Sequence, residues 1–137
     1  MSDDRRDPFI GTRFRVEIDG TSSSSALAVA LPESRLLRQD DPGSVQYSAL
    51  VIQRGLTART DWYGWWDAAR RSKDPRPRTV TVVLVDAHGA DAWRWIFANS
   101  EPIGYRVSGL VAMAAEPLVE TLELSVRTFE AVGPPAR

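Results

Sequence analysis

Residues 13–20, Arg-Phe-Arg-Val-Glu-Ile-Asp-Gly, carry the alternating pattern that most constrains the fold. Phe14, Val16 and Ile18 point to one side of an extended chain, and the charged side chains between them point to the other. This period of two is typical of a strand with one buried face, and Asp19-Gly20 favours a turn at its end. A strand this early predicts that the N-terminal part of the chain is tied into a sheet.

Strand-like patterns recur through the rest of the chain. Residues 26–31 alternate small and large apolar groups, which fits a strand with Leu27, Val29 and Leu31 in the core, although helix propensity fits them nearly as well. Residues 45–54 have no decisively polar face, which suggests that protein covers both faces. The other expected strands lie at residues 79–85, 93–97, 103–107 and 118–129, and the expected loops at residues 21–25, 40–43, 86–89, 99–102 and 108–117.

One helix is predicted between the third and fourth of these strands. Thr60 or Asp61 can cap its N-terminus by accepting a backbone hydrogen bond. Basic side chains at its other end complement the helix dipole, and Pro75 and Pro77 end it. Its apolar residues recur at helical spacing and form one stripe: Trp62, Trp65, Trp66 and Ala69.

The expected fold class is mainly β, an antiparallel β-sandwich or barrel with one flanking α-helix. We expect one domain over residues 1–137, with an N-terminal arm at residues 1–8 and a loose tail at residues 130–137. The five tryptophans follow helical or strand spacing, which favours an aromatic core over a binding module that uses surface tryptophans. The expected core residues are Phe14, Val16, Ile18, Leu50, Ile52, Trp62, Trp65, Trp66, Trp93, Trp95, Leu122 and Leu124.

The sequence gives little support for catalysis or metal binding. With no cysteine, a thiolate metal site is excluded, and a Ser-His-Asp arrangement would need His88, the one histidine, which lies in a predicted turn. The pairs Asp3-Asp4 and Asp40-Asp41 lack the spacing of a coordinating loop. Glu120 and Glu123 have opposite strand parity, which argues against a carboxylate dyad. We therefore expect no enzyme, no cofactor and no metal.

Charge and hydropathy narrow the class of partner. Seventeen basic and eighteen acidic residues leave a net charge of −1, so no global field attracts nucleic acid or an anionic membrane. No apolar run resembles a signal peptide or a membrane span, so we expect synthesis in the cytoplasm, with any export by another route. One local basic cluster favours a solvated surface, with a docking site as the alternative: Arg70, Arg71, Lys73, Arg76 and Arg78.

Four segments, in this order, carry a resemblance. They are the opening at residues 7–20, the segment Tyr-Ser-Ala-Leu-Val-Ile-Gln-Arg-Gly-Leu-Thr at residues 47–57, the hairpin at residues 80–99, and Leu-Val-Glu-Thr-Leu-Glu-Leu at residues 118–124. Together they resemble the tail-tube protein family of contractile phages and contractile injection systems. Three features depart from the family. Residues 26–41 are a shortened match to a strand and the channel-lining hairpin after it, and Glu101 stands before Pro102 where members often have an aromatic residue. Val-Arg-Thr at residues 126–128 replaces the closing His-Glu-Gly.

The resemblance implies a structural subunit that forms hexameric rings, which stack into the inner tube of a contractile tail and conduct DNA or effectors. The implied partners are further copies of itself, sheath and baseplate proteins, and the cargo in the lumen, with no membrane and no sequence-specific nucleic acid. The product would be part of a phage tail or an injection-system particle. Alternatives are a tube-initiating or tube-end adaptor at the baseplate and a secreted ring-forming carrier of the type six system.

The resemblance also suggests which residues face the lumen. The family places the strand that corresponds to residues 45–54 beside the channel, with Leu50 and Ile52 toward the subunit core. Alternation then places a second set of side chains on the face toward the lumen or a neighbouring subunit: Tyr47, Ala49, Val51 and Gln53.

Overall fold

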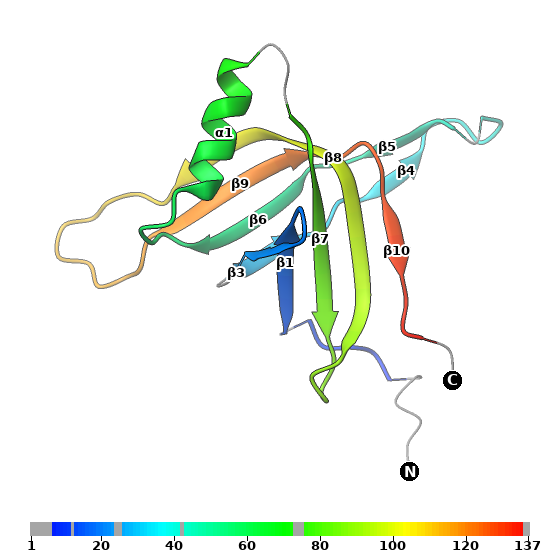
Figure 1. Ribbon diagram of the computed structural model, residues 1–137, viewed down its shortest axis with the longest axis horizontal. Helices are drawn as coiled ribbons and strands as arrows, with labels where there is room; N and C mark the ends of the chain where they lie inside the picture. The colour runs from blue at the N-terminus through cyan, green and yellow to red at the C-terminus, as the bar shows by residue number, and fades with distance from the viewer. Residues whose placement is uncertain (1–6, 12, 24–25, 42, 73–75, 136–137) are drawn as a thin grey trace.

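The computed structural model describes residues 7–11, 13–23, 26–41, 43–72 and 76–135. Several sequence predictions fall outside the described residues. They concern residues 1–6 of the predicted arm, which include the Asp3-Asp4 pair, and also Lys73 and Pro75. Parts of the predicted loops and tail, at residues 24–25, 42 and 136–137, also lie outside them. In the described part no helix is long and apolar enough to cross a membrane. Its elements (Figure 1) are β1 (Phe14–Ile18), β2 (Thr21–Ser23), β3 (Ala26–Ala30), β4 (Ser34–Leu36), β5 (Val45–Tyr47), β6 (Leu50–Gly55), α1 (Asp61–Arg71), β7 (Arg78–Val85), β8 (Asp91–Val107), β9 (Val119–Ser125) and β10 (Glu130–Val132).

One large sheet follows the order β2-β1-β7-β8-β9-β6-β3, with β10 paired to β8, and β4 and β5 form a separate hairpin. Every pairing is antiparallel. Strand β7 lies between β1 and β8, as expected for its β-branched sequence, and five consecutive residues of it are buried. The predicted fold class, mainly β and antiparallel with one helix, is confirmed.

Strand β8 continues through residues 99–102, where the sequence analysis wrongly predicted a break. Two register irregularities make this possible: the first includes Asn99, whose φ is 57°, and the second follows Pro102. Bulges of this kind bend a strand. Residues 91–100 therefore pair with β7 and residues 101–107 with β9. This strand joins two half-sheets. The first half-sheet consists of β2, β1, β7, residues 91–100 and β10. The second half-sheet consists of residues 101–107, β9, β6 and β3.

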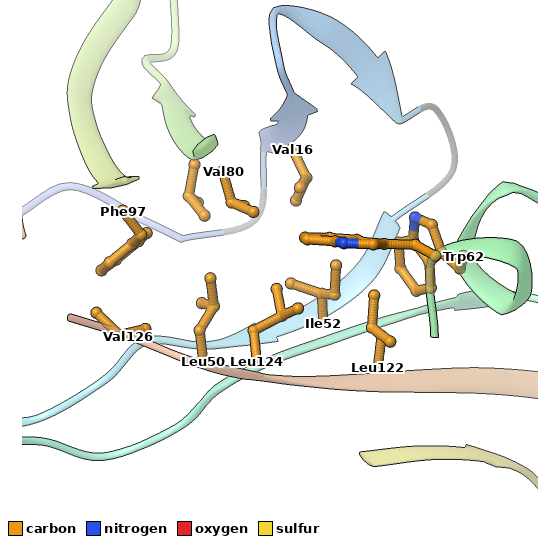
Figure 2. Packing of buried hydrophobic residues seen from close by; sticks show 11 residues of the cluster. Val16, Leu50, Ile52, Trp62, Val80, Phe97, Leu122, Leu124 and Val126 are labelled. Atoms are coloured by element: carbon orange, nitrogen blue, oxygen red, sulfur yellow. The ribbon is translucent and has the colours of Figure 1, made fainter. Parts of the chain in front are cut away.

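The hydrophobic core fills the space between the two half-sheets (Figure 2). Val16, Val80 and Phe97 come from the first half-sheet, Leu50 comes from the second, and Trp62 of α1 closes one end of the cluster. All five are at most 1% exposed. Full burial of a single large apolar side chain contributes about 1.5–3 kcal/mol, so this cluster is the main source of stability.

The expected core residues fall into three groups. Seven are buried: Val16, Leu50, Ile52, Trp62, Trp65, Leu122 and Leu124. Four are partly buried and pack against the cluster: Phe14, Ile18, Trp66 and Trp95. Trp93 is partly exposed outside the cluster and stacks nearly parallel on Trp95, with ring centroids 6.1 Å apart.

Strand β3 forms as predicted, but the expectation that Leu27 and Leu31 lie in the core is wrong. Leu27 is 60% exposed and Leu31 is 43% exposed. A register shift between Ala26 and Ala28 adds one residue to β3 opposite β6. The extra residue reverses the alternation at that point, so Ala26 packs against the core in place of Leu27, while Val29 packs against it as predicted. Leu31 lies beyond the end of β3 at Ala30.

Other boundaries also differ from the sequence expectations, and the strand expected at residues 118–129 ends at Ser125. Residues 21–23 are a strand rather than a loop, because Asp19 and Gly20 have φ of 51° and 80° and so form a tight two-residue turn that returns β2 along β1. Residues 45–54 are two strands in different sheets, interrupted at residues 48–49. The expected loose tail begins with β10, which pairs with residues 94–96 of β8.

Candidate assembly surface

The described residues contain no group of three or more His, Asp or Glu side chains that could hold a metal ion. His88 lies in the exposed turn between β7 and β8, where its backbone N–H donates to Asp86 Oδ1 at 2.8 Å. Asp40 and Asp41 are exposed near the tip of the β4–β5 hairpin. The sheet and its free edges are therefore the candidate surface.

Glu120 and Glu123 point to opposite sides of β9, as their parity predicts. Glu120 is 1% exposed, whereas Glu123 lies on the outer side and accepts a hydrogen bond from Arg106 Nη1 at 2.8 Å. Arg54 of β6 is 2% exposed and donates from Nε to Glu120 Oε1. The Tyr105 hydroxyl donates to Glu120 Oε2 at 2.6 Å. A charged pair thus lies inside the second half-sheet with both carboxylate oxygens hydrogen-bonded.

Arg54 also holds the helix to the sheet. Its Nη2 donates to Asp61 Oδ1 at 2.7 Å at the start of α1, and its guanidinium lies 4.1 Å from the ring centroid of Trp62. Ser23 accepts from Arg54 Nη1 at 3.3 Å and from Trp62 Nε1 at 3.2 Å. One side chain therefore joins β6, β9, β2 and α1, which makes it a structural residue.

The predicted helix is confirmed, but its cap differs from the expectation. Thr60 occupies the cap position without a side-chain hydrogen bond. Asp61 lies in the first turn, where a negative charge is favourable. Burial alone would raise the pKa of the Asp61 carboxyl, but the hydrogen bonds and charge of Arg54 outweigh it and hold that pKa below its ordinary value.

The outward side of the second half-sheet, here called the wall face, is the candidate for a channel lining or subunit contact. Leu50 and Ile52 point into the core, so alternate residues of the same strand point outward. The β pairing aligns these residues across the four strands in two rows. The rows are Ala28, Gln53, Thr121, Arg106 and Ala30, Val51, Glu123, Gly104.

Most polar groups of the wall face are already paired within it. Gln53 Nε2 donates to Thr121 Oγ1 at 3.0 Å. The charges of Arg106 and Glu123 neutralise each other in an ion pair of 2.8 Å. A Cβ at Gly104 would lie 3.3 Å from the Glu123 carboxylate, so glycine leaves room for that side chain. The resulting surface has no net charge, because Arg106 and Glu123 are its only ionisable side chains in these two rows.

The structure separates the residues expected on the lumen side. Val51 and Gln53 lie on the wall face and are partly buried, and Ala49 precedes β6 by one residue. Tyr47 belongs to β5 instead, where it packs against the core cluster and its ring lies 6.4 Å from that of Phe129. The break between β5 and β6 removes Tyr47 from the face that strand parity had assigned to it.

The second half-sheet has two free edges. In the described part of the chain no strand pairs with β3 on the side away from β6, or with residues 101–107 on the side away from β9. Because each neighbouring pair is antiparallel, β3 and residues 101–107 run in opposite directions. Exposed edges of this kind are ready templates for pairing with another chain.

The outward side of the first half-sheet carries a compact charge network instead. Arg15 donates both terminal nitrogens to the Asp91 carboxylate at 2.7 and 2.8 Å and its Nε to Glu17 at 2.8 Å. Arg94 lies 3.7 Å from carboxylate oxygens of both acids. In the predicted basic cluster, the two helical arginines share Asp67, so that cluster is partly neutralised.

Sequence reasoning missed Arg54 and Glu120 as a pair. A signal was present, because Arg54 has the strand parity of Leu50 and Ile52 while Glu120 has that of Leu122, so each charge lies on an apolar face. A charge that must be buried needs an opposite charge nearby. Arg54 and Glu120, two opposite charges on apolar strand faces, could therefore have been predicted as partners although they are 66 positions apart in the sequence.

Comparison with known proteins assigns the fold to a family. The family model described as T4-like virus tail tube protein gp19 matches residues 11–130. A chain in the tube-terminating cap of the anti-feeding prophage superposes with a TM-score of 0.75 at 14% identity, covering 93% of each chain. A chain in the extended sheath–tube complex of the extracellular contractile injection system PVC has a TM-score of 0.71 at 14% identity, covering 97% of this chain and 99% of that one.

Hcp1 from Flavobacterium johnsoniae has the same fold, with a TM-score of 0.66 at 16% identity and coverage of 88% of this chain and 94% of that one. At these identities the structural likenesses establish the fold. No curated protein sequence matches the chain significantly.

Proposed function

The chain belongs to the T4-like virus tail tube protein family, and on that premise we propose that it forms hexameric rings that stack into the inner tube of a contractile phage tail or injection system. The protein is a structural component of such a particle and performs no reaction. Its partners are further copies of itself, sheath and baseplate proteins, and the DNA or effector that passes through the lumen. Synthesis in the cytoplasm precedes assembly.

The two free edges of the second half-sheet are the observation that carries this proposal. Strand β3 of one copy and residues 101–107 of the next run in opposite directions, so they can continue the antiparallel pattern from subunit to subunit. Such a contact is head-to-tail, and it closes into a ring when the rotation between copies permits. Closure would cover both edges and remove a site of aggregation.

The wall face supports the placement of this half-sheet on the inside of the ring. A conduit must let its cargo pass without binding it. The wall face has its two charges paired at 2.8 Å and Gln53 bonded to Thr121, so it offers few free donors or acceptors to a cargo. Val51 and Gln53 are accordingly the residues that we place toward the lumen.

Negative-stain microscopy and mass measurement of the purified protein test the proposal. Rings or tubes of one diameter are expected, and a monomer at every concentration would contradict the ring and favour a binding module. Ile103→Asp, which places a charge on a free edge at a residue 55% exposed, should leave a folded monomer. The matched control is Ile10→Asp, at a residue that is 74% exposed and belongs to no strand, which should still form rings.

A tube-initiating or tube-end adaptor at the baseplate is a second candidate. It is favoured by the similarity to chains in the tube-terminating cap, with a TM-score of 0.75, and in the baseplate of the anti-feeding prophage, with a TM-score of 0.71. An adaptor would form single rings that do not stack on one another, whereas a main tube subunit would form long tubes under the same conditions.

A further inference from the structure

Two segments project from opposite ends of the second half-sheet (Figure 1). The apolar loop, residues 108–118, joins the end of β8 to the start of β9 beside Gly55. The hairpin arm, residues 34–41 and 43–47, lies between the end of β3 and the start of β6 at Leu50. If the strands of this half-sheet line a tube, the two segments lie at opposite ends of each ring.

The apolar loop exposes three large hydrophobic side chains. Leu110 is 82% exposed, Val111 is 73% exposed and Met113 is fully exposed. Met113 also has a φ of 67°, a left-handed conformation that is unusual for a bulky residue and costs free energy. In the isolated subunit no packing contact offsets this cost, because the Met113 side chain is exposed to water. A partner that buries Met113 would explain both the conformation and the exposure.

The hairpin arm exposes a matching set of apolar side chains. Leu36 and Val45 are cross-strand partners, 51% and 39% exposed, and Leu37 is 60% exposed. Both arginines of the arm have acidic partners, Arg38 with Asp40 of the arm at 3.7 Å and Arg35 with Glu33 just before it, so they do not compete with an apolar contact. An isolated two-stranded hairpin is marginally stable in water. The arm therefore also needs a covering surface.

We propose that the apolar loop of one copy packs against the hairpin arm of a second copy in the adjacent ring, with Met113 against the Leu36–Val45 pair. The contact rests on the proposed ring and gives its stacking a definite polarity. Because the loop and the arm lie at opposite ends of the half-sheet, this pairing is head-to-tail and can be repeated indefinitely. A loop-to-loop contact would be self-complementary and would stop after two rings.

Disulfide cross-linking tests the contact directly, since the chain has no cysteine of its own. In the double variant Met113→Cys with Leu36→Cys, mild oxidation should give a ladder of linked oligomers on a non-reducing gel, because each copy has one donor and one acceptor site. Each single variant should remain monomeric on the same gel. The control double variant Met113→Cys with His88→Cys, which uses the exposed turn between β7 and β8, should give no ladder.

The outcomes separate this inference from the proposed function. Stacked rings by microscopy without a ladder would overturn the loop–arm contact and leave the tube standing. Dimers from the single variant Met113→Cys would show loop-to-loop contact and also overturn it. A ladder without rings would support the contact and contradict the ring. If neither rings nor a ladder form, both proposals fail.

A charge substitution provides a second readout that does not depend on cross-linking. Met113→Asp should keep the fold, because Asp tolerates the left-handed conformation better than most residues. The protein concentration needed for stacking should rise about tenfold or more, as expected from the loss of one buried large apolar contact, while single rings persist. Met113→Leu should stack like the unaltered protein. Unchanged stacking of Met113→Asp would overturn the proposal.

Discussion

Arg54 and Glu120 form an ion pair in which both side chains are almost completely buried, at 2% and 1% exposure. A second arginine–glutamate pair, Arg106 with Glu123, joins the same strand β9 to β8 on the outward side, where the side chains are 59% and 37% exposed. The two pairs have similar chemistry and opposite surroundings. Comparing substitutions in the two pairs therefore shows how burial changes the contribution of an ion pair to the free energy of unfolding in this fold.

Arg54→Leu should lower the free energy of unfolding by about 3–5 kcal/mol, because it leaves the buried Glu120 carboxylate without its counter-charge. Arg106→Leu, the matched control, should cost at most about 1 kcal/mol, as for other exposed pairs. Urea denaturation of both variants checks the difference. Equal losses would show that Arg54 is not buried as the structure places it.

Local patterns predicted the elements whose burial follows from alternation alone. Strand β1 has the expected inward face at Phe14, Val16 and Ile18, and α1 buries Trp62 and Trp65 of its predicted stripe. In these elements the chain is regular, so each side chain's direction follows from its position.

The predictions that were wrong concern elements in which the backbone is irregular. The bend at residues 99–102 resembles a strand end in sequence, yet two bulges carry β8 through it. One extra residue in β3 exposed Leu27, and the interruption at residues 48–49 placed Tyr47 in another sheet. A single inserted residue reverses strand parity, and the cross-strand partners that allow it are distant in sequence. The Arg54–Glu120 pair likewise depends on a contact between remote segments.

Trp65→Ala should lower the free energy of unfolding by about 3–5 kcal/mol, because the side chain is 4% exposed and its removal leaves a cavity under α1. Tyr63 of the same helix is 43% exposed, so Tyr63→Ala should have a much smaller effect. Thermal and chemical unfolding of the two variants measure the contrast. An unchanged melting temperature for Trp65→Ala would contradict the burial of this residue.

Asp61 should contribute to acid denaturation. Burial opposes ionisation of Asp61, but Arg54 overcomes this and lowers the pKa of the folded carboxyl. The stabilisation is therefore present above the unfolded-state pKa of about 3.9 and is lost as the pH falls through the lower folded-state pKa. The unfolding free energy of Asp61→Asn should fall less steeply below about pH 4 than that of the unaltered protein. Identical acid profiles would rule out this linkage.

Tyr105 should show the opposite linkage at alkaline pH. Burial, together with its hydrogen bond to Glu120, raises the pKa of the Tyr105 hydroxyl to about 12. The folded state thus favours the neutral phenol, and this stabilisation is complete below the unfolded-state pKa of about 10 and is lost as the pH rises through the folded value. Phenolate absorbance should show a late titration that Tyr105→Phe removes. Its persistence in that variant would assign it to another tyrosine.

The wall face gives a test of which side of β6 faces the lumen. Gln53 points outward and is bonded to Thr121, whereas Leu50 is fully buried in the core. In assembled tubes of the Gln53→Cys variant, a small thiol reagent that enters through the bore should react readily. The Leu50→Cys variant should stay protected until the protein unfolds. The chain has no other cysteine to interfere. Ready labelling at residue 50 with protection at residue 53 would mean that the strand is turned over, since a shift of one residue exchanges its two faces.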